Sequence, residues 1–148
     1  MSYQEKRSLV SLVGTLLISA LYGVFIYQRY PTGSPETSEV FKFWGAALLL
    51  FVPVQVVFKV ILYVLLNVLN TIATREEEPE IADEMDRLIE LKSVRNFCYV
   101  FMIGFFLAVG APVVDLEPSV MFLILLITFV VCGAVLDISA FYFYRKGI

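Results

Sequence analysis

Four long blocks of apolar residues alternate with short polar connections along the chain. The blocks cover approximately residues 9–28, 41–69, 94–114 and 120–144. A helix needs about 20 apolar residues to cross the roughly 30 Å hydrocarbon core of a bilayer, and each block reaches that length. The pattern therefore predicts an all-α integral membrane protein, in which residues 1–148 form a single domain of four transmembrane helices arranged as two hairpins.

The three polar connections differ in character. Residues 29–39 contain two prolines and a glycine, which is typical of an exposed loop, and residues 115–119 read as a tight turn. The connection at residues 74–93 is longer, and from about residue 80 its apolar residues recur every three or four positions. This spacing predicts an acidic helix between the second and third transmembrane helices, with the option that it runs directly into the third.

Basic residues are distributed unequally between the two ends of the predicted helices. Because loops on the cytoplasmic side carry an excess of Lys and Arg, the richer end predicts the cytoplasmic side. Both termini and residues 74–93 are then cytoplasmic, and the protein is expected in the cell (inner) membrane. Arg29 and Lys42 lie at the poorer end, and the richer end holds Lys6, Arg7, Arg75, Arg87, Lys92, Arg95, Arg145 and Lys146.

The composition agrees with a bilayer as the principal partner. Apolar residues make up 59% of the chain, and its mean hydropathy is +0.83. A small soluble domain cannot bury that much apolar surface, whereas lipid covers it. Eight of the fourteen acidic residues fall within residues 76–90, and no basic patch indicates binding to nucleic acid.

The residue types needed for most catalytic chemistry are scarce. The chain has no histidine, and its two cysteines, Cys98 and Cys132, lie in separate apolar blocks without a metal-binding or redox spacing. No glycine-rich phosphate loop or nucleophile motif is present. We therefore expect neither an enzyme nor a bound cofactor or metal.

Two charged residues stand in otherwise apolar surroundings. Lys59 lies inside the second block, and Asp137 is the only acidic residue of the fourth. The two predicted helices run in the same direction, and both residues lie at a similar distance from their starts, so their depths in the bilayer match. An ion pair, within one chain or between two, is the leading interpretation. Alternatively, Lys59 extends to the inner surface, or the residues take part in conduction.

Two further stripes accompany these charges. The polar stripe on the second helix is compatible with a water-lined path or with polar contacts between packed helices. The small-residue stripe on the first helix predicts a face that another helix approaches closely. The polar stripe consists of Gln55, Lys59, Tyr63, Asn67 and the nearby Asn70, and the small-residue stripe of Ser11, Thr15, Ser19 and Gly23.

The cytoplasmic segment has three possible roles. It lacks the glycine and ligand spacing of a calcium loop, which leaves a weak divalent-cation site, a docking element, or a solvated helix face whose apolar side packs on the bundle. Its candidate interaction residues are Asp83, Glu84, Asp86, Arg87, Glu90, Lys92 and Arg95.

The run DEMDRLIELKSVRNFCYVF at residues 83–101 resembles an uncharacterised group of small prokaryotic four-helix membrane proteins. Members of that group carry an acidic D-E-x-D/R-x-x-I-x-x-K segment directly before their third hydrophobic helix. The resemblance covers about twenty residues and the order of hydrophobic blocks. It implies a polytopic prokaryotic membrane protein with a cytoplasmic interaction motif, and it implies no activity.

Two functions fit these features. The first is an accessory or interaction subunit, either homo-oligomeric or attached to a larger membrane complex. The second is a small oligomeric transporter or channel, whose polar path would be lined by the second and fourth helices. The direction in which the polar stripe points distinguishes them.

Overall fold

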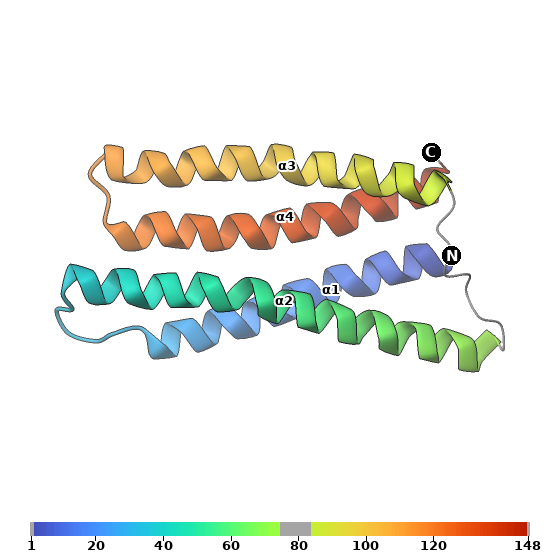
Figure 1. Ribbon diagram of the computed structural model, residues 1–148, viewed down its shortest axis with the longest axis horizontal. Coiled ribbons are helices and arrows are strands. Elements are labelled where there is room, and N and C mark those ends of the chain that lie inside the picture. The colour runs from blue at the N-terminus through green and yellow to red at the C-terminus, as the bar shows by residue number, and fades with distance from the viewer. Residues whose placement is uncertain (1, 75–83, 148) are drawn as a thin grey trace.

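The computed structural model describes residues 2–74 and 84–147, and every regular element within them is an α-helix. Each of the four helices is long and apolar enough to cross a membrane, as the hydrophobic pattern predicts. Figure 1 shows them as a bundle of long rods. They are α1 (Tyr3–Arg29), α2 (Thr37–Thr74), α3 (Glu84–Val113) and α4 (Pro118–Lys146).

Local sequence signals set several of the helix ends. The hydroxyl of Ser2 accepts a hydrogen bond from the Glu5 backbone N–H at 3.2 Å, which caps the start of α1. At the other end of the chain, Gly147 adopts a left-handed backbone conformation with φ of 74°. Its N–H donates to the carbonyl of Phe143 at 3.0 Å, so α4 ends where a residue without a Cβ allows the turn.

The acidic segment is helical in its described part and follows the predicted option of running directly into the third span. Its described part, residues 84–93, forms the first turns of α3 without a break, so it is not a separate helix there. Proline and glycine are the residues that most often interrupt a helix, and this stretch contains neither.

The two ends of the bundle contain different parts of the chain (Figure 1). The connection from α1 to α2 and the connection from α3 to α4 lie at one end, which we call the loop end. The chain termini lie near the opposite end, which we call the terminal end. Helices α2 and α4 therefore run in the same direction, from the loop end to the terminal end.

Helix α4 occupies the centre of the bundle. It packs against α1, α2 and α3, whereas α3 contacts only α4 among residues 2–74 and 84–147. The contact between α3 and α4 is the most extensive, and Gly104 is its point of closest approach, because a Cβ there would overlap the side chain of Thr128. Ala108, one turn further along α3, is completely buried.

An apolar core fills the bundle at the loop end. Tyr22 packs against Phe51 with ring centroids 5.2 Å apart, and the Tyr22 hydroxyl donates to the carbonyl of Ala47. Trp44 stacks on Phe122, and its indole N–H donates to the Ser119 hydroxyl at 3.2 Å. We call this cluster the aromatic core. It consists of Tyr22, Ile26, Trp44, Ala47, Phe51 and Leu126.

Helix α2 separates from the bundle towards the terminal end. It crosses α1 and then continues away from the other helices (Figure 1). Five apolar side chains of this part are at least half exposed in the single chain. We call this surface the α2 apolar end. It consists of Val64, Leu65, Val68, Leu69 and Ile72.

Candidate functional site

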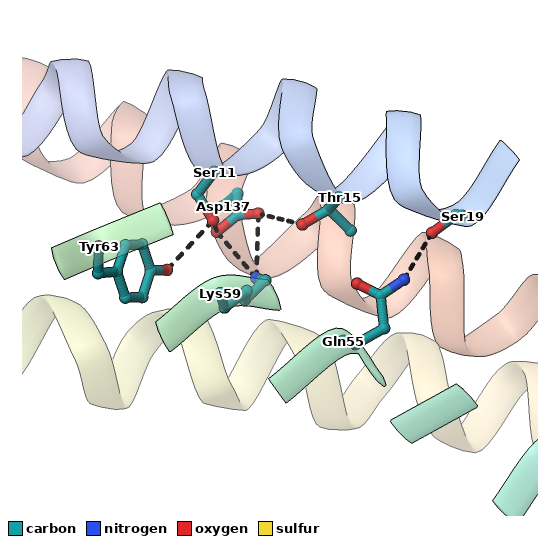
Figure 2. Close-up of polar contacts among 7 residues, drawn as sticks. All are labelled: Ser11, Thr15, Ser19, Gln55, Lys59, Tyr63 and Asp137. Atoms are coloured by element: carbon teal, nitrogen blue, oxygen red, sulfur yellow. Dashed lines mark hydrogen bonds and ion pairs between the residues drawn. The ribbon is translucent and has the colours of Figure 1, made fainter. Parts of the chain in front are cut away.

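Lys59 and Asp137 form an ion pair within one chain. Lys59 Nζ lies 3.2 Å from Asp137 Oδ2 and 3.4 Å from Oδ1 (Figure 2). The Asp137 side chain is 6% exposed and that of Lys59 is 20% exposed. Two charges with so little access to solvent need each other, because an unpaired charge in such surroundings is costly. The Lys59 side chain therefore points towards α4, and the Asp137 carboxylate compensates its charge.

Hydroxyl groups from α1 complete the surroundings of the carboxylate (Figure 2). Ser11 Oγ donates to Asp137 Oδ1 at 2.9 Å, and Thr15 Oγ1 donates to Oδ2 at 3.4 Å. The Tyr63 hydroxyl lies 3.1 Å from Ser11 Oγ. Hydrogen bonds to a charged acceptor are stronger than those between neutral groups, so these contacts tie α1, α2 and α4 together at one level. We call Ser11, Thr15, Lys59, Tyr63 and Asp137 the Asp137 cluster.

The predicted small-residue stripe is only partly a packing face. Ser11 and Thr15 are buried, and Thr15 lies against the position of Gly133 on α4. Ser19 accepts a hydrogen bond from Gln55 Nε2 at 2.9 Å. Gly23 does not have the predicted close approach, because a Cβ there would meet no atom of the described residues within 4 Å.

The reason for this difference at Gly23 is the size of the neighbouring side chains. Gly23 lies in an apolar groove of about 360 Å³ whose walls include Tyr30 and Trp44. These large rings hold the helices apart. On the same helix, Gly14 has close neighbours, because a Cβ there would lie 2.9 Å from the side-chain ring of Phe58 on α2.

The polar stripe of α2 divides into two parts. Gln55, Lys59 and Tyr63 contact side chains of α1 or α4, as Figure 2 shows. Asn67 is exposed, and its carbonyl accepts a hydrogen bond from Thr71 at 2.9 Å, while Asn70 is half-buried. The first part of the stripe therefore serves contacts inside the chain, and Asn67 lies on the part of α2 that leaves the bundle.

The residues predicted to form a cytoplasmic interaction segment are distributed around the start of α3 where the structure describes them. Asp83 lies outside the described residues, and so does Arg75. Four of the others, Glu84, Arg87, Glu90 and Arg95, are exposed, while Asp86 and Lys92 are half-buried. The Lys92 ammonium lies 5.5 Å from the centre of the Phe143 ring, which fastens the start of α3 to the end of α4.

A cavity of about 410 Å³ lies at the terminal end and reaches Asp137. Its walls come from all four helices, and Asp86 and Glu90 of the acidic segment belong to them. We call it the terminal cavity. Other polar residues of its walls, which the sequence analysis did not single out for this role, are Gln4, Arg7, Ser8, Ser93 and Tyr144.

One signal in the sequence points to part of this cavity. Ser8 lies three residues before Ser11 and extends the small polar face of α1 towards the chain terminus. Arg7 and Ser93 carry no comparable signal, because single polar residues near a helix end are usually solvated. Their position in a cavity depends on how α1 and α3 are placed around α4.

Charged side chains in the walls of the terminal cavity can recognise charged groups. The Arg7 guanidinium lies 4.1 Å from the centre of the Tyr63 ring, and carboxylates face the cavity from α3. Within residues 2–74 and 84–147, no group of three or more Cys, Asp or Glu side chains could hold a metal ion. Comparison of the chain with protein families, with curated proteins and with solved structures found no match.

Proposed function

We propose that all four helices cross the cell membrane as two hairpins, with both chain termini in the cytoplasm. The length and hydropathy of the helices support insertion, and the unequal distribution of Lys and Arg supports this orientation. Labelling of a cysteine introduced at Ser34 by an impermeant reagent outside intact cells, with Ser2→Cys as the internal control, tests the orientation. The opposite labelling pattern would reverse it.

Within that membrane, we propose that the protein is an interaction subunit whose α2 apolar end binds a second copy of the chain. The observation that carries this proposal is the exposure of this surface. Helix α2 has 38 residues and a length of about 57 Å, well beyond the roughly 30 Å of a bilayer core. Tilting of the helix accommodates only part of that excess length, so the last turns of α2 need another apolar surface to cover them.

Asn67 favours a second copy over an unrelated partner. Its exposed side chain lies between Val64 and Val68 on the α2 apolar end. An amide both donates and accepts hydrogen bonds, so two Asn67 side chains related by a twofold axis complement each other. Polar contacts of this kind hold transmembrane helices together.

Photo-crosslinking in native membranes tests this proposal. A photo-reactive residue at Leu65 or Leu69 is expected to form an adduct with twice the mass of the chain, and Asn67→Leu is expected to reduce its yield. Leu17, an exposed apolar residue of α1, is the matched control and should give little adduct. Adducts of another mass would indicate a larger membrane complex instead, and equal yields at all three positions would contradict a specific surface.

A second candidate function is transport. The observation that favours it is that the terminal cavity reaches Asp137 from one end of the bundle only. The aromatic core fills the bundle at the other end. A transporter has to open that end in part of its cycle, whereas an interaction subunit does not. Leu136 lines the cavity beside Asp137, so Leu136→Cys in a chain with Cys98→Ala and Cys132→Ala reports access. Reaction with an impermeant thiol reagent from the loop side would support transport, and reaction from the terminal side alone would oppose it.

A further inference from the structure

Basic side chains gather at the terminal end of the bundle, where α3 begins and α4 ends (Figure 1). We call this group the basic cluster. The Asn96 amide nitrogen on α3 donates to Ser139 Oγ on α4 at 3.0 Å, so the start of α3 lies beside the last two turns of α4. The cluster consists of Lys92 and Arg95 of α3 and Arg145 and Lys146 of α4.

The two cations of α4 fold back along their own helix. Lys146 Nζ donates to the Tyr142 hydroxyl at 3.3 Å and lies 5.6 Å from the centre of that ring. The guanidinium carbon of Arg145 lies 6.0 Å from the centre of the Phe141 ring. Side chains of a helix lean towards its N-terminus, which for α4 is the loop end. Both cationic groups are therefore held on the side of the apolar part of α4 and do not extend beyond the end of the helix.

No carboxylate of a described residue neutralises the basic cluster. Within residues 2–74 and 84–147, the ion pair is that of Lys59 with Asp137, and none of the four cluster residues makes one. The described carboxylates of α3, together with Arg87, come before Lys92 and so lie further from the apolar part of the helix; they are Glu84, Asp86 and Glu90. The cluster thus keeps a net positive charge beside the apolar part of both helices.

Exposed tyrosines mark the same level of α3 and α4. Tyr99, one turn beyond Arg95, is 63% exposed, and Tyr142 is 53% exposed. Tyrosine is enriched where a transmembrane helix passes from the hydrocarbon core to the headgroup region. In the membrane arrangement proposed above, the cluster therefore lies at the depth of the lipid headgroups. The inference that follows rests on this insertion and not on the α2 apolar end.

We propose that the basic cluster binds the headgroups of anionic phospholipids in the leaflet at the terminal end. Lys and Arg donate charge-assisted hydrogen bonds to phosphate oxygens, and the Tyr142 hydroxyl adds a neutral donor. A zwitterionic lipid brings its own cation, which offsets the attraction, whereas an anionic lipid brings net negative charge. A lipid headgroup fits better than an acidic soluble partner, because it already occupies the depth at which Arg145 and Lys146 are held.

Quenching of a single tryptophan by brominated acyl chains reports which lipid lies beside a chosen position. Trp44 is the only tryptophan of the chain, so Trp44→Phe removes the background. Tyr99→Trp then places a reporter beside the cluster, and Tyr27→Trp is the matched reporter at the loop end, where Tyr27 is 85% exposed. The full chain is reconstituted in vesicles of equal parts phosphatidylglycerol and phosphatidylcholine, with bromine on one lipid at a time.

The two quenching values at each position give the binding preference for phosphatidylglycerol over phosphatidylcholine. We expect a preference of about threefold or more at position 99 and nearly equal binding at position 27, because several cations act together only at the terminal end. Added salt should reduce the preference at position 99, since it screens exposed charges.

Two double substitutions test the cluster itself. Arg145→Gln with Lys146→Gln, and separately Lys92→Gln with Arg95→Gln, should each lower the preference at position 99 by about half or more. Conservative exchange, Arg145→Lys with Lys146→Arg, should retain it. The matched control removes two cations at the loop end, Arg29→Gln with Lys42→Gln, and should leave the value at position 99 unchanged.

The outcomes separate this proposal from membrane insertion. Equal quenching by the two brominated lipids at position 99, or a preference that survives both double substitutions, would overturn the lipid site while insertion stands. Absence of quenching by either lipid at both positions would show that the helices do not lie in the bilayer, and it would overturn insertion together with the site. Thermal unfolding followed by circular dichroism verifies that each variant is folded.

Discussion

The loop end and the terminal end of the bundle are held together by different interactions. At the loop end, apolar and aromatic side chains of α1, α2 and α4 fill the interior as the aromatic core. Towards the terminal end, the contacts among the same three helices are largely polar and centre on Asp137. Large apolar side chains fill space where helices run close together, whereas polar side chains reach specific partners where the helices diverge.

This difference has a consequence for the way each end responds to change. Removing part of an apolar core leaves a hole whose cost depends on how well the neighbours collapse. Removing one member of a polar cluster leaves its partners charged or unpaired, which costs more than the net contribution of the original contact. We therefore expect the largest effects of single substitutions in the Asp137 cluster.

The largest effect is expected from breaking the ion pair. Lys59→Ala and Asp137→Ala should each lower the free energy of unfolding by about 3 kcal/mol, because each leaves a buried charge without its partner. The double variant should recover most of that loss, since no charge then remains. Unfolding of the purified protein by SDS in mixed micelles measures the three values.

The exchange of the two residues, Lys59→Asp with Asp137→Lys, is the control for this cycle. It keeps one charge of each sign but places the carboxylate on α2, away from the hydroxyls of Ser11 and Thr15. Partial recovery is therefore expected. Additive losses in the double variant would show that the two charges act independently and would contradict the structural pair.

The next effect tests close packing nearer the loop end. Gly104→Val should lower the free energy of unfolding by about 2 kcal/mol, because its side chain would overlap Thr128. Thr128 cannot move away freely, since its hydroxyl donates to the carbonyl of Ile124 at 2.7 Å. Gly110→Val on the same helix is the matched control, because a Cβ there meets no described atom within 4 Å. Equal losses at the two glycines would show that helix propensity, not contact with α4, decides the result.

Some features of the fold and of the site could be predicted from the sequence, and others could not, depending on whether the sequence pattern alone determines them. The four helices follow directly from apolar blocks of sufficient length, which depend on composition more than on packing. Lys59 and Asp137 could be assigned to each other because isolated charges at equal depth leave few other partners, and the structure contains that contact. Asn67 has the same spacing as Gln55 and Tyr63, and nothing in the spacing reveals that α2 has left the bundle at that point.

Other features depend on helix crossing, which a linear pattern does not contain. Ser11 and Thr15 were assigned to a packing face, and their hydrogen bonds to Asp137 depend on which side of α1 faces α4. Gly23 fits the same stripe, yet large rings hold the helices apart there. The terminal cavity has walls from all four helices, and the backbones of α1 and α3 do not come close to each other among the described residues, so no single segment could have predicted it.

A smaller effect is expected from a polar contact within the aromatic core. Tyr22→Phe should lower the free energy of unfolding by about 1 kcal/mol, because the Ala47 carbonyl loses the hydroxyl donor while the ring remains in place. Tyr27→Phe is the control, since Tyr27 is 85% exposed. The same SDS titration measures both variants. A loss for Tyr22→Phe near that of Lys59→Ala would contradict the expectation that single substitutions cost less at the loop end than in the Asp137 cluster.

The smallest effect is expected at Gln55, although it belongs to the same stripe as Lys59. Its Nε2 donates to Ser19, but its Oε1 is buried and makes no hydrogen bond within the described residues. Gln55→Leu removes this unpaired acceptor together with one neutral hydrogen bond, in which the Ser19 hydroxyl oxygen is the acceptor. The free energy of unfolding should therefore change by less than about 0.6 kcal/mol, which is the average for a polar contact between membrane helices. A loss as large as that of Lys59→Ala would mean that a neutral hydrogen bond between α1 and α2 stabilises the bundle as strongly as the buried charges do.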